Sequence, residues 1–178
     1  IWINMNVNKK IFITGASGGI GSAICKKFKN NNFKLVLTSS SDEKIEILKN
    51  QYGSDNFYYK IDLSDSEKLQ LSLDRLTKEH KDISVIVNNA GTNEDNLIFR
   101  MKIEQWSSVI QTNLNSNYQI IKSLLPNMLS NKYGKIIGIS SIVASTGNPG
   151  QANYVASKSG MVGLYKSIAS EVARRNIN

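Results

Sequence analysis

Five short apolar runs alternate with five longer segments of helical periodicity, and this alternation most constrains the fold. The apolar runs lie at residues 10–14, 33–38, 57–61, 83–87 and 135–139, and the helical segments at 19–30, 42–51, 64–80, 103–129 and 153–174. A repeated order of strand and then helix predicts a parallel sheet with right-handed crossovers. We therefore expect an α/β fold of three layers (α/β/α), with a doubly wound parallel sheet.

Two segments carry local signals as well. Residues 83–87 are mainly β-branched, which suits a strand that is buried on both faces. The segment 64–80 begins with Ser64, followed three residues later by Glu67. This spacing predicts a helix whose first turn is capped by Ser64.

The chain is expected to form one domain over residues 5–178, because no repeat, low-complexity tract or linker divides it. Residues 1–4 show no signal-peptide pattern, so we interpret them as upstream sequence, while a removed transit peptide stays open. A Rossmann-like dinucleotide fold orders six strands 3-2-1-4-5-6. Only five are found before the sequence stops. We therefore expect the C-terminal strands to be missing, and a protein ending at Asn178 to be inactive.

Composition excludes several classes of protein. The single cysteine and the single histidine, Cys25 and His80, cannot make an internal disulfide framework or an ordinary structural zinc site. No apolar run approaches the roughly 18 residues that a membrane span requires. We therefore expect a soluble protein without a metal, cytoplasmic or, if a transit peptide was removed, organellar.

The net charge of +8, from 22 basic and 14 acidic residues, bears on possible partners. The lysines are spread along the chain rather than gathered into one basic run. This spread is typical of solvated helix faces and argues against nucleic-acid binding. A diffuse positive surface suits an acidic protein partner equally well.

A glycine-rich turn follows the first predicted strand. Gly15, Gly19 and Gly21 form the pattern G-x-x-x-G-x-G between a strand and a helix. Glycines there allow a tight turn and a close approach of the backbone to a pyrophosphate, for which the helix N-terminus supplies N–H donors. The turn therefore predicts nucleotide binding.

The same turn contains the G-x-S-x-G pattern of α/β-hydrolases, with Ser17 between Gly15 and Gly19. A hydrolase would also need an acid and a histidine later in the chain. The only histidine, His80, lies in the charged stretch 78–82 at a helix end, where we expect it to be exposed. Because no histidine follows it, we expect no hydrolase triad.

A pair of side chains marks the start of the last predicted helix. Tyr154 and Lys158 are four residues apart, so they share one helix face. The spacing alone is weak, since Tyr118 and Lys122 repeat it within the long helix. Context distinguishes the two pairs, because Ser141 lies thirteen residues before Tyr154, at the end of a strand.

Residues 88–91 (Asn-Asn-Ala-Gly) follow the fourth predicted strand. Open α/β sheets bind ligands at the carboxyl ends of their strands, although a simple turn would explain these residues equally well. The full set of motifs resembles that of the short-chain dehydrogenase/reductases, from about residue 9 to the end. The residues that carry the resemblance are Gly15, Gly19, Gly21, 88–91, Asn113, Ser141, Tyr154 and Lys158.

Within that family, the segments 96–101, 112–114 and 150–154 and Trp106 are similar to the 3-oxoacyl-[acyl-carrier-protein] reductases of fatty-acid synthesis. The resemblance implies an NADPH-dependent enzyme that reduces a 3-oxoacyl group on acyl carrier protein to the 3-hydroxyacyl form. It also implies an acidic carrier protein that docks on Lys132 and Arg175, and a homotetramer as the full-length form.

The resemblance implies a catalytic set of Asn113, Ser141, Tyr154 and Lys158. Tyr154 would protonate the substrate carbonyl oxygen, assisted by Lys158, which in the family also holds the nicotinamide ribose. Ser141 would donate a hydrogen bond to the same oxygen. Asn113 would hold a local break in the long helix and a water for proton resupply. Substrate contacts are expected at Ser141, Gln151 and Tyr154.

The implied cofactor site joins the glycine turn to later strand ends, with Asp62 at the adenine and Asn89 against the cofactor. Its expected members are Gly15, Ala16, Ser17, Gly18, Gly19, Ile20, Gly21, Ser40, Asp62, Leu63, Asn89, Ala90, Gly91, Tyr154 and Lys158. NAD-specific members place an acidic residue at the end of the second strand, whereas residues 38–41 contain no carboxylate. This favours NADPH. NADH stays the alternative, because Gly18 stands where many NADPH-using relatives have an arginine.

Two other interpretations stay open. One is a reductase or dehydrogenase of another carbonyl or alcohol, such as acetoacetyl-CoA, a sugar or a steroid. The other is a nucleotide-binding module without turnover.

Overall fold

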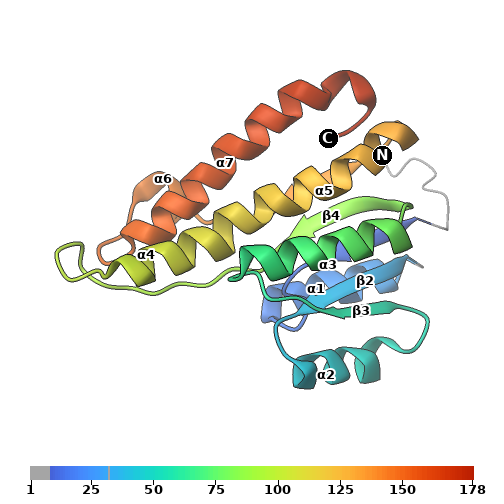
Figure 1. The fold of residues 1–178 in the computed structure, drawn as a ribbon, viewed down its shortest axis with the longest axis horizontal. Helices are drawn as coiled ribbons and strands as arrows, with labels where there is room; N and C mark the ends of the chain where they lie inside the picture. The colour runs from blue at the N-terminus through green and yellow to red at the C-terminus, as the bar shows by residue number, and fades with distance from the viewer. Residues whose placement is uncertain (1–8, 32) are drawn as a thin grey trace.

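A parallel five-stranded sheet lies between two layers of helices in the computed structural model, which describes residues 9–31 and 33–178 (Figure 1). The strands are β1 (Lys10–Ile13), β2 (Lys34–Ser39), β3 (Phe57–Lys60), β4 (Ile83–Asn88) and β5 (Lys135–Gly138). They lie in the order β3-β2-β1-β4-β5. This order confirms the doubly wound α/β fold. The interpretation of residues 1–4 concerns a segment outside the described residues.

Seven α-helices are found in the described part of the chain. They are α1 (Gly19–Lys29), α2 (Asp42–Tyr52), α3 (Ser66–Glu79), α4 (Ile103–Ile110), α5 (Ser116–Asn131), α6 (Val143–Thr146) and α7 (Ala152–Val172). A π-helix, η1 (Gln111–Asn115), joins α4 to α5, and a 3-10 helix, η2 (Ala173–Arg175), follows α7. None of the described helices is both long and apolar enough to cross a lipid bilayer.

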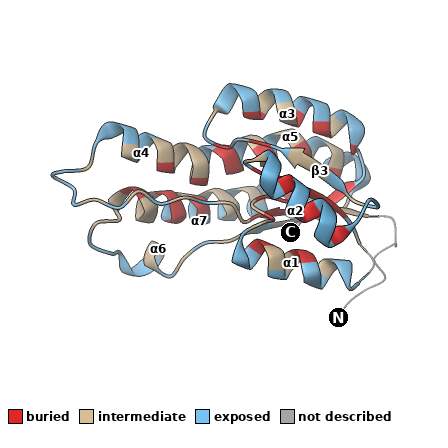
Figure 2. Cartoon of the chain, turned by 90° about the horizontal axis from the view of Figure 1, so that it is seen from below, coloured by how far each residue is buried: buried red, intermediate tan, exposed pale blue. Residues whose placement is uncertain are grey.

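The core has two parts because side chains alternate between the two faces of each strand. Ile11 and Ile13 of β1 pack with apolar side chains of α1 and α2, whereas Phe12 packs with those of α3 and α5. Figure 2 shows the buried residues on the sides of the helices that face the sheet. Every residue of β4 is buried, as the β-branched run predicts.

The first turn of α3 differs from the prediction. Asp65, not Ser64, caps the helix, because Asp65 Oδ1 accepts hydrogen bonds from the backbone N–H groups of Glu67 (3.1 Å) and Lys68 (3.0 Å). Ser64 lies before the helix and donates its hydroxyl to Asp62 Oδ1 at 2.6 Å. A carboxylate accepts from two backbone donors at once, and it also suits the positive end of the helix dipole.

The segment predicted as one long helix over 103–129 is three elements: α4, η1 and α5. The π-turn inserts a break around Asn113, where the resemblance implied one. The last helix begins at Ala152 and ends at Val172, two residues before the predicted end. Residues 176–178 then lie along the start of β5, where Ile136 N–H donates to the carbonyl of Asn178 at 2.8 Å and Ile177 forms a parallel bridge with Gly134.

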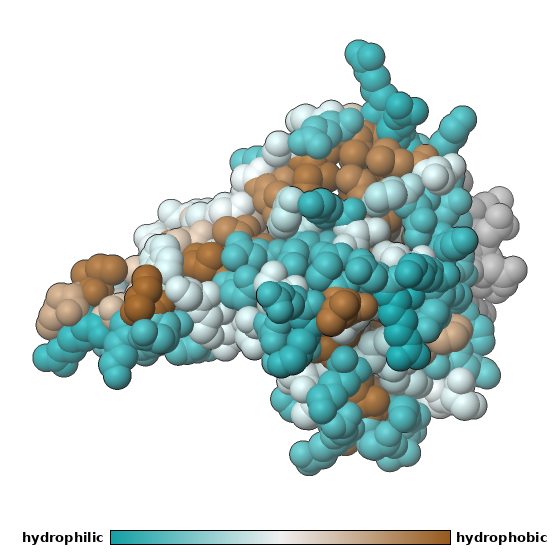
Figure 3. Space-filling view, in the orientation of Figure 1, coloured by the Kyte–Doolittle hydropathy of each residue, from teal (hydrophilic) through white to brown (hydrophobic). Residues whose placement is uncertain are grey.

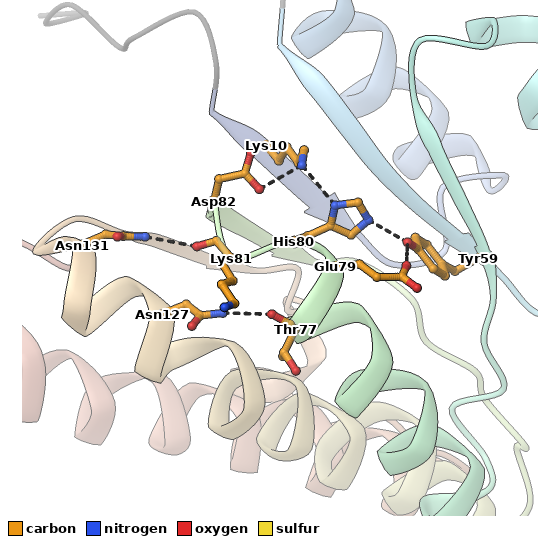
Figure 4. A network of polar contacts seen from close by, with 9 residues as sticks. All are labelled: Lys10, Tyr59, Thr77, Glu79, His80, Lys81, Asp82, Asn127 and Asn131. Carbon is orange, nitrogen blue, oxygen red and sulfur yellow. Dashed lines mark hydrogen bonds and ion pairs between the residues drawn. The ribbon is translucent and has the colours of Figure 1, made fainter.

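The prediction that His80 is exposed is wrong, since 3% of its surface is accessible. His80 ends α3 at the amino-terminal edge of the sheet, and its ring stacks edge-on against Phe57 of β3, with centroids 4.5 Å apart. Figure 4 shows that its two ring nitrogens face Lys10 Nζ (3.1 Å) and Tyr59 Oη (2.6 Å). Its neighbours Glu79 and Asp82 pair with Arg75 and Lys10 at this edge, while the ring itself is buried.

The hydrogen bonds assign one neutral form to His80. The Lys10 ammonium can only donate, so Nδ1 of His80 must accept. The Tyr59 hydroxyl donates to Glu79 Oε2 at 2.6 Å, so it accepts from Nε2–H of His80. Burial, and then the charge of Lys10, lower the pKa of His80, whereas Asp82 and Glu79 act in the opposite direction.

We predict that His80 makes the free energy of unfolding depend on pH between about pH 7 and pH 5. The unfolded chain binds a proton at His80 near the ordinary pKa of about 6.5, whereas the folded chain resists protonation to a lower pH. The unfolded state therefore binds more protons in this range, so stability falls as the pH drops, by at most about 1.4 kcal/mol per pH unit. Urea unfolding at several pH values measures this slope.

His80→Gln is the matched variant, because its amide can accept from Lys10 and donate to Tyr59 but does not titrate. Its free energy of unfolding should change less over the same pH range. Equal slopes in the two proteins would contradict the role assigned to His80.

Candidate active site

A two-part cleft lies at the carboxyl edge of the sheet, on the opposite side from His80. The larger compartment, about 600 Å³, is lined by the glycine turn and by residues that follow β2, β3 and β4. The smaller compartment, about 430 Å³, contains Ser141, Gln151, Tyr154 and Lys158. The two compartments share Ile20, Asn89, Gly91 and Thr92. The cleft lies between β1 and β4, where the strand order reverses, which is the ligand-binding position of open α/β sheets.

The glycine turn is shaped by close backbone contacts. Gly15 has a φ of +62°, a conformation that favours glycine. A Cβ on Gly21 would lie 2.2 Å from the carbonyl oxygen of Gly15 and 2.8 Å from Nδ2 of Asn89. No side chain caps the first turn of α1. Its N–H groups therefore stay available to an anion in the larger compartment.

Asn89 fastens this turn to the end of β4. Its Nδ2 donates to the carbonyl oxygens of Thr14 (3.0 Å) and Gly15 (3.1 Å). In return, Thr14 Oγ1 accepts from the backbone N–H groups of Asn89 and Ala90, both at 3.0 Å. These reciprocal bonds hold the two loops at a fixed separation.

The structure brings most of the expected cofactor residues into the larger compartment. These are Gly15, Ser17, Gly18, Gly19, Ile20, Gly21, Ser40, Asp62, Leu63, Asn89, Ala90 and Gly91. Ala16 is an exception, because it is fully buried and its N–H donates to Thr38 O at 3.1 Å. Two hydrogen bonds from Ser64 lower the pKa of Asp62, so this carboxylate is ionised at neutral pH. Lys44, which the sequence did not single out, also lines this compartment.

The predicted helix face places Tyr154 and Lys158 side by side in the smaller compartment. Lys158 Nζ lies 5.7 Å from the centre of the Tyr154 ring and donates to the carbonyl oxygen of Ile139 at 2.8 Å. Lys158 is 4% exposed, and burial lowers its pKa. Ser141 lies in the same compartment, between the end of β5 and α6. A buried cation, a phenol and a hydroxyl therefore converge on one space.

Gln151, for which the resemblance implied a substrate contact, lines the smaller compartment. Its Nε2 donates to Asp95 Oδ2 at 2.9 Å, and its Oε1 accepts from Asn148 at 3.0 Å. The fully buried Asn153 donates to the carbonyl oxygens of Glu94 (2.9 Å) and Gln105 (3.1 Å). The start of α7 is thereby tied to the loop 92–102 and to α4.

Asn113 connects the π-turn to both sides of the cleft. Its Oδ1 accepts from Thr92 N–H, and its Nδ2 donates to Thr92 O, both at 2.8 Å. The same Nδ2 donates to Ser157 Oγ at 3.1 Å, and Ser157 donates to the carbonyl of Tyr154 at 2.7 Å. Asn113 therefore holds the loop after β4 and the helix that carries Tyr154 in one arrangement.

The sequence did not reveal the residues that support the π-turn. Asn117 Nδ2 donates to the carbonyl of Asn113 at 2.9 Å, and Asn117 Oδ1 accepts from Tyr165 Oη at 2.9 Å. Tyr165 in turn accepts from Nδ2 of Asn88 at 2.8 Å. The one signal in the sequence is spacing: Asn117 lies four residues after Asn113, and Tyr165 lies seven residues after Lys158, so each pair shares a helix face. Such spacings are common and did not identify these residues.

Two other sequence patterns do not form an active site: the second Tyr-x-x-x-Lys pair lies outside the cleft, and the G-x-S-x-G pattern has no histidine beside its serine. Tyr118 is 49% exposed, so the second Tyr-x-x-x-Lys pair, with Lys122, lies on an outer face. Ser17 Oγ bonds to Ser39 Oγ at 2.9 Å, and His80 lies at the opposite edge of the sheet. Over residues 9–31 and 33–178, no three His, Cys, Asp or Glu side chains gather as metal ligands do.

Lys132 and Arg175, the expected docking residues, lie close together but far from the cleft. Both are exposed, and Asn176 Nδ2 donates to the carbonyl of Lys132 at 3.3 Å. Lys132 follows the end of α5, and Arg175 follows the end of α7. Tyr154 lies near the start of α7, so at about 1.5 Å per residue it is roughly 30 Å from Arg175 along the helix axis.

Comparisons with known proteins agree with this arrangement. A family model described as short chain dehydrogenase matches residues 9–178. The 3-oxoacyl-[acyl-carrier-protein] reductase FabG of Haemophilus influenzae is 40% identical over 169 residues, which cover 95% of this chain and 70% of that protein. The FabG of Buchnera aphidicola is 38% identical over 174 residues, which cover 97% and 71%.

A solved structure is also similar. The crystal structure of a metagenomic short-chain oxidoreductase in complex with NADP superimposes with a TM-score of 0.90 at 31% sequence identity. The match covers 96% of this chain and 78% of that chain.

Replacement of Asn113 by alanine should lower the free energy of unfolding by about 3 kcal/mol. The change would remove the side-chain partner of the Thr92 N–H and C=O groups and one of the two hydrogen bonds of the buried Ser157 hydroxyl, and each unpaired polar group that is shielded from water costs about 1–3 kcal/mol. Asn115→Ala is the matched control, because Asn115 is exposed and bonds only to Gln111 by its side chain. We expect a change within about 0.5 kcal/mol for the control. Similar urea unfolding curves for both variants would argue against a clamp at Asn113.

Proposed function

The chain belongs to the short-chain dehydrogenase family, and on that premise we propose that it reduces the carbonyl of a 3-oxoacyl group on acyl carrier protein with NADPH. One observation carries the proposal. Tyr154, Lys158 and Ser141 line a compartment that continues into the compartment of the glycine turn. A cofactor lying along both compartments would bring its reactive end to the phenol of Tyr154.

The residues of the larger compartment fit a dinucleotide. Gly15 and Gly21 pack against the protein's own backbone and Asn89, whereas Gly19 faces open space, and the uncapped N–H groups of α1 suit a pyrophosphate there. Asp62 can accept hydrogen bonds at the adenosine end of the compartment. When bound, the nicotinamide supplies the hydride.

The smaller compartment supplies the proton chemistry. Tyr154 donates its hydroxyl proton to the carbonyl oxygen while the carbonyl carbon takes up the hydride, so the product is a 3-hydroxyacyl group. Ser141 donates a hydrogen bond to the same oxygen as negative charge develops there. The Lys158 ammonium, held by the carbonyl of Ile139, places a positive charge beside the phenolate that Tyr154 becomes.

The end of β2 supports NADPH rather than NADH. Ser39 and Ser40 line the cleft, and no carboxylate lines it there. The nearest acid in the sequence, Asp42, is bound to Lys60 at 2.6 Å and does not line the cleft. A 2′-phosphate would therefore meet no negative side chain from this strand. The similar solved structure is a complex with NADP.

Three observations support a carrier-linked acyl substrate. The similar curated proteins are 3-oxoacyl-[acyl-carrier-protein] reductases. The net charge of +8 suits an acidic partner. Figure 3 shows hydrophobic surface along the arm that α4 and the preceding loop form beside the smaller compartment, where Ile98, Phe99 and Ile103 are more than 60% exposed.

The proposed docking residues add a condition. Because Lys132 and Arg175 lie roughly 30 Å from Tyr154 of their own chain, a carrier protein bound there would serve the cleft of another copy. The proposal therefore includes the homotetramer that the family resemblance implies for the full-length form. The cytoplasmic location stays a prediction.

Tyr154→Phe tests the reductase against a nucleotide-binding module without turnover. In a protein that oxidises NADPH with a 3-oxoacyl thioester, the change should lower kcat by about a thousandfold or more, since a general acid is lost. NADPH affinity should stay within about twofold, because the ring remains. Tyr118→Phe, in the second Tyr-x-x-x-Lys pair, should leave both values unchanged. Turnover that survives in Tyr154→Phe would refute the proposed role.

Charge reversal tests the carrier-protein partner. Lys132→Glu combined with Arg175→Glu should raise KM for an acyl-carrier-protein substrate about tenfold or more, and leave KM for a small β-ketoester unchanged. The same reversal at Lys26 and Lys27 of α1 serves as the control for net charge. Equal effects of the first pair on both substrates would count against docking at these residues, and a panel of other ketones would then identify the substrate.

A further inference from the structure

One cation lies in the larger compartment where no catalytic role accounts for it. Among the described residues that line this compartment, Lys44 in the first turn of α2 is the one basic residue, and Asp62 is the one acidic residue. They lie after different strands, since Lys44 follows β2 and Asp62 follows β3. The side of the compartment next to β2 is therefore lined by a lysine and by no acid.

The charge of Lys44 is not used elsewhere in the described part of the chain. No carboxylate lies within ion-pair distance of its ammonium, whereas Lys60 and Lys49 pair with Asp42 and Glu46. Helix geometry explains the difference, because the residues three and four positions from Lys44 are serines, isoleucine and leucine. The Lys44 ammonium therefore has no ion-pair partner among the described residues that a ligand phosphate would have to displace.

The surroundings of Lys44 suit a phosphate group. Ser39 and Ser40 line the cleft beside it, and the Ser39 hydroxyl also bonds to Ser17 of the glycine turn at 2.9 Å. Gly18 has no side chain, and an added Cβ there would meet only the Gly15 carbonyl, at 3.5 Å. Space and hydroxyl donors are therefore present at the β2 side, and a single flexible cation faces them.

We propose that Lys44 binds the 2′-phosphate of NADP(H) and thereby determines the preference for NADPH over NADH. This inference rests on the proposed function. It assigns the recognition charge to the first turn of α2 instead of the glycine turn, where Gly18 supplies none. The lysine and the serine hydroxyls together replace the carboxylate that would bond a 2′-hydroxyl in an NAD-binding relative.

Equilibrium binding tests the assignment without any need for turnover. Dissociation constants for NADPH, NADH, adenosine 2′,5′-bisphosphate and adenosine 5′-monophosphate are measured by calorimetry for the wild type and for Lys44→Gln, Lys44→Arg and Lys44→Glu. We expect the wild type to prefer the 2′-phosphorylated member of each pair, and Lys44→Gln to reduce that ratio about tenfold. Lys44→Arg should keep the ratio, and Lys44→Glu should favour NADH.

Lys49→Gln is the matched control, since it removes a charge from the exposed surface of the same helix. Its ratios should equal those of the wild type. A wild type that prefers NADPH together with an unchanged ratio in Lys44→Gln would overturn the assignment and leave the proposed function intact. A wild type that does not distinguish the members of either pair would instead contradict NADPH as the cofactor, and with it the role of Lys44.

Discussion

The contact between the glycine turn and the loop after β4 is the constraint on which the cleft depends. Gly21 lies so near the carbonyl of Gly15 that no Cβ fits between them, and Asn89 bonds to two carbonyls of the same turn. These contacts bring the start of α1 to the end of β4 with its N–H groups exposed. A larger residue at Gly21 would clash with Gly15 and Asn89 and so separate the two loops that line the larger compartment.

The catalytic compartment depends on a second set of contacts, which centre on the π-turn. A π-turn leaves a carbonyl without its usual helical partner, and Asn117 supplies a side-chain N–H to the carbonyl of Asn113. Asn113 can then direct its amide toward Thr92 and Ser157. Because Asn113, Asn117 and Ser157 are buried, their polar groups must find partners in the protein, and few arrangements satisfy all of them. The position of Tyr154 follows from that restriction.

Prediction from the sequence succeeded where neighbours along the chain decide the outcome. Helical periodicity placed Tyr154 and Lys158 on one face, and the glycine pattern located the turn that lines the larger compartment. It failed where a distant residue decides. His80 looks like a surface residue among charged neighbours, but its partners Lys10 and Tyr59 lie 70 and 21 positions away. A local pattern failed once as well, because Ser64 matches a capping pattern but the adjacent Asp65 accepts from two backbone donors and caps the helix.

The sequence by itself determined the order of strands and helices, the position of the glycine turn, and the residue types that bear the chemistry. These properties follow from spacing and from backbone preferences that act within a few residues. Only the tertiary structure decided which side chains share the cleft, including Lys44, and which polar groups support Asn113. The reason is physical: burial and hydrogen bonding join groups such as Asn88 and Tyr165, 77 positions apart, and no local pattern specifies such a pair.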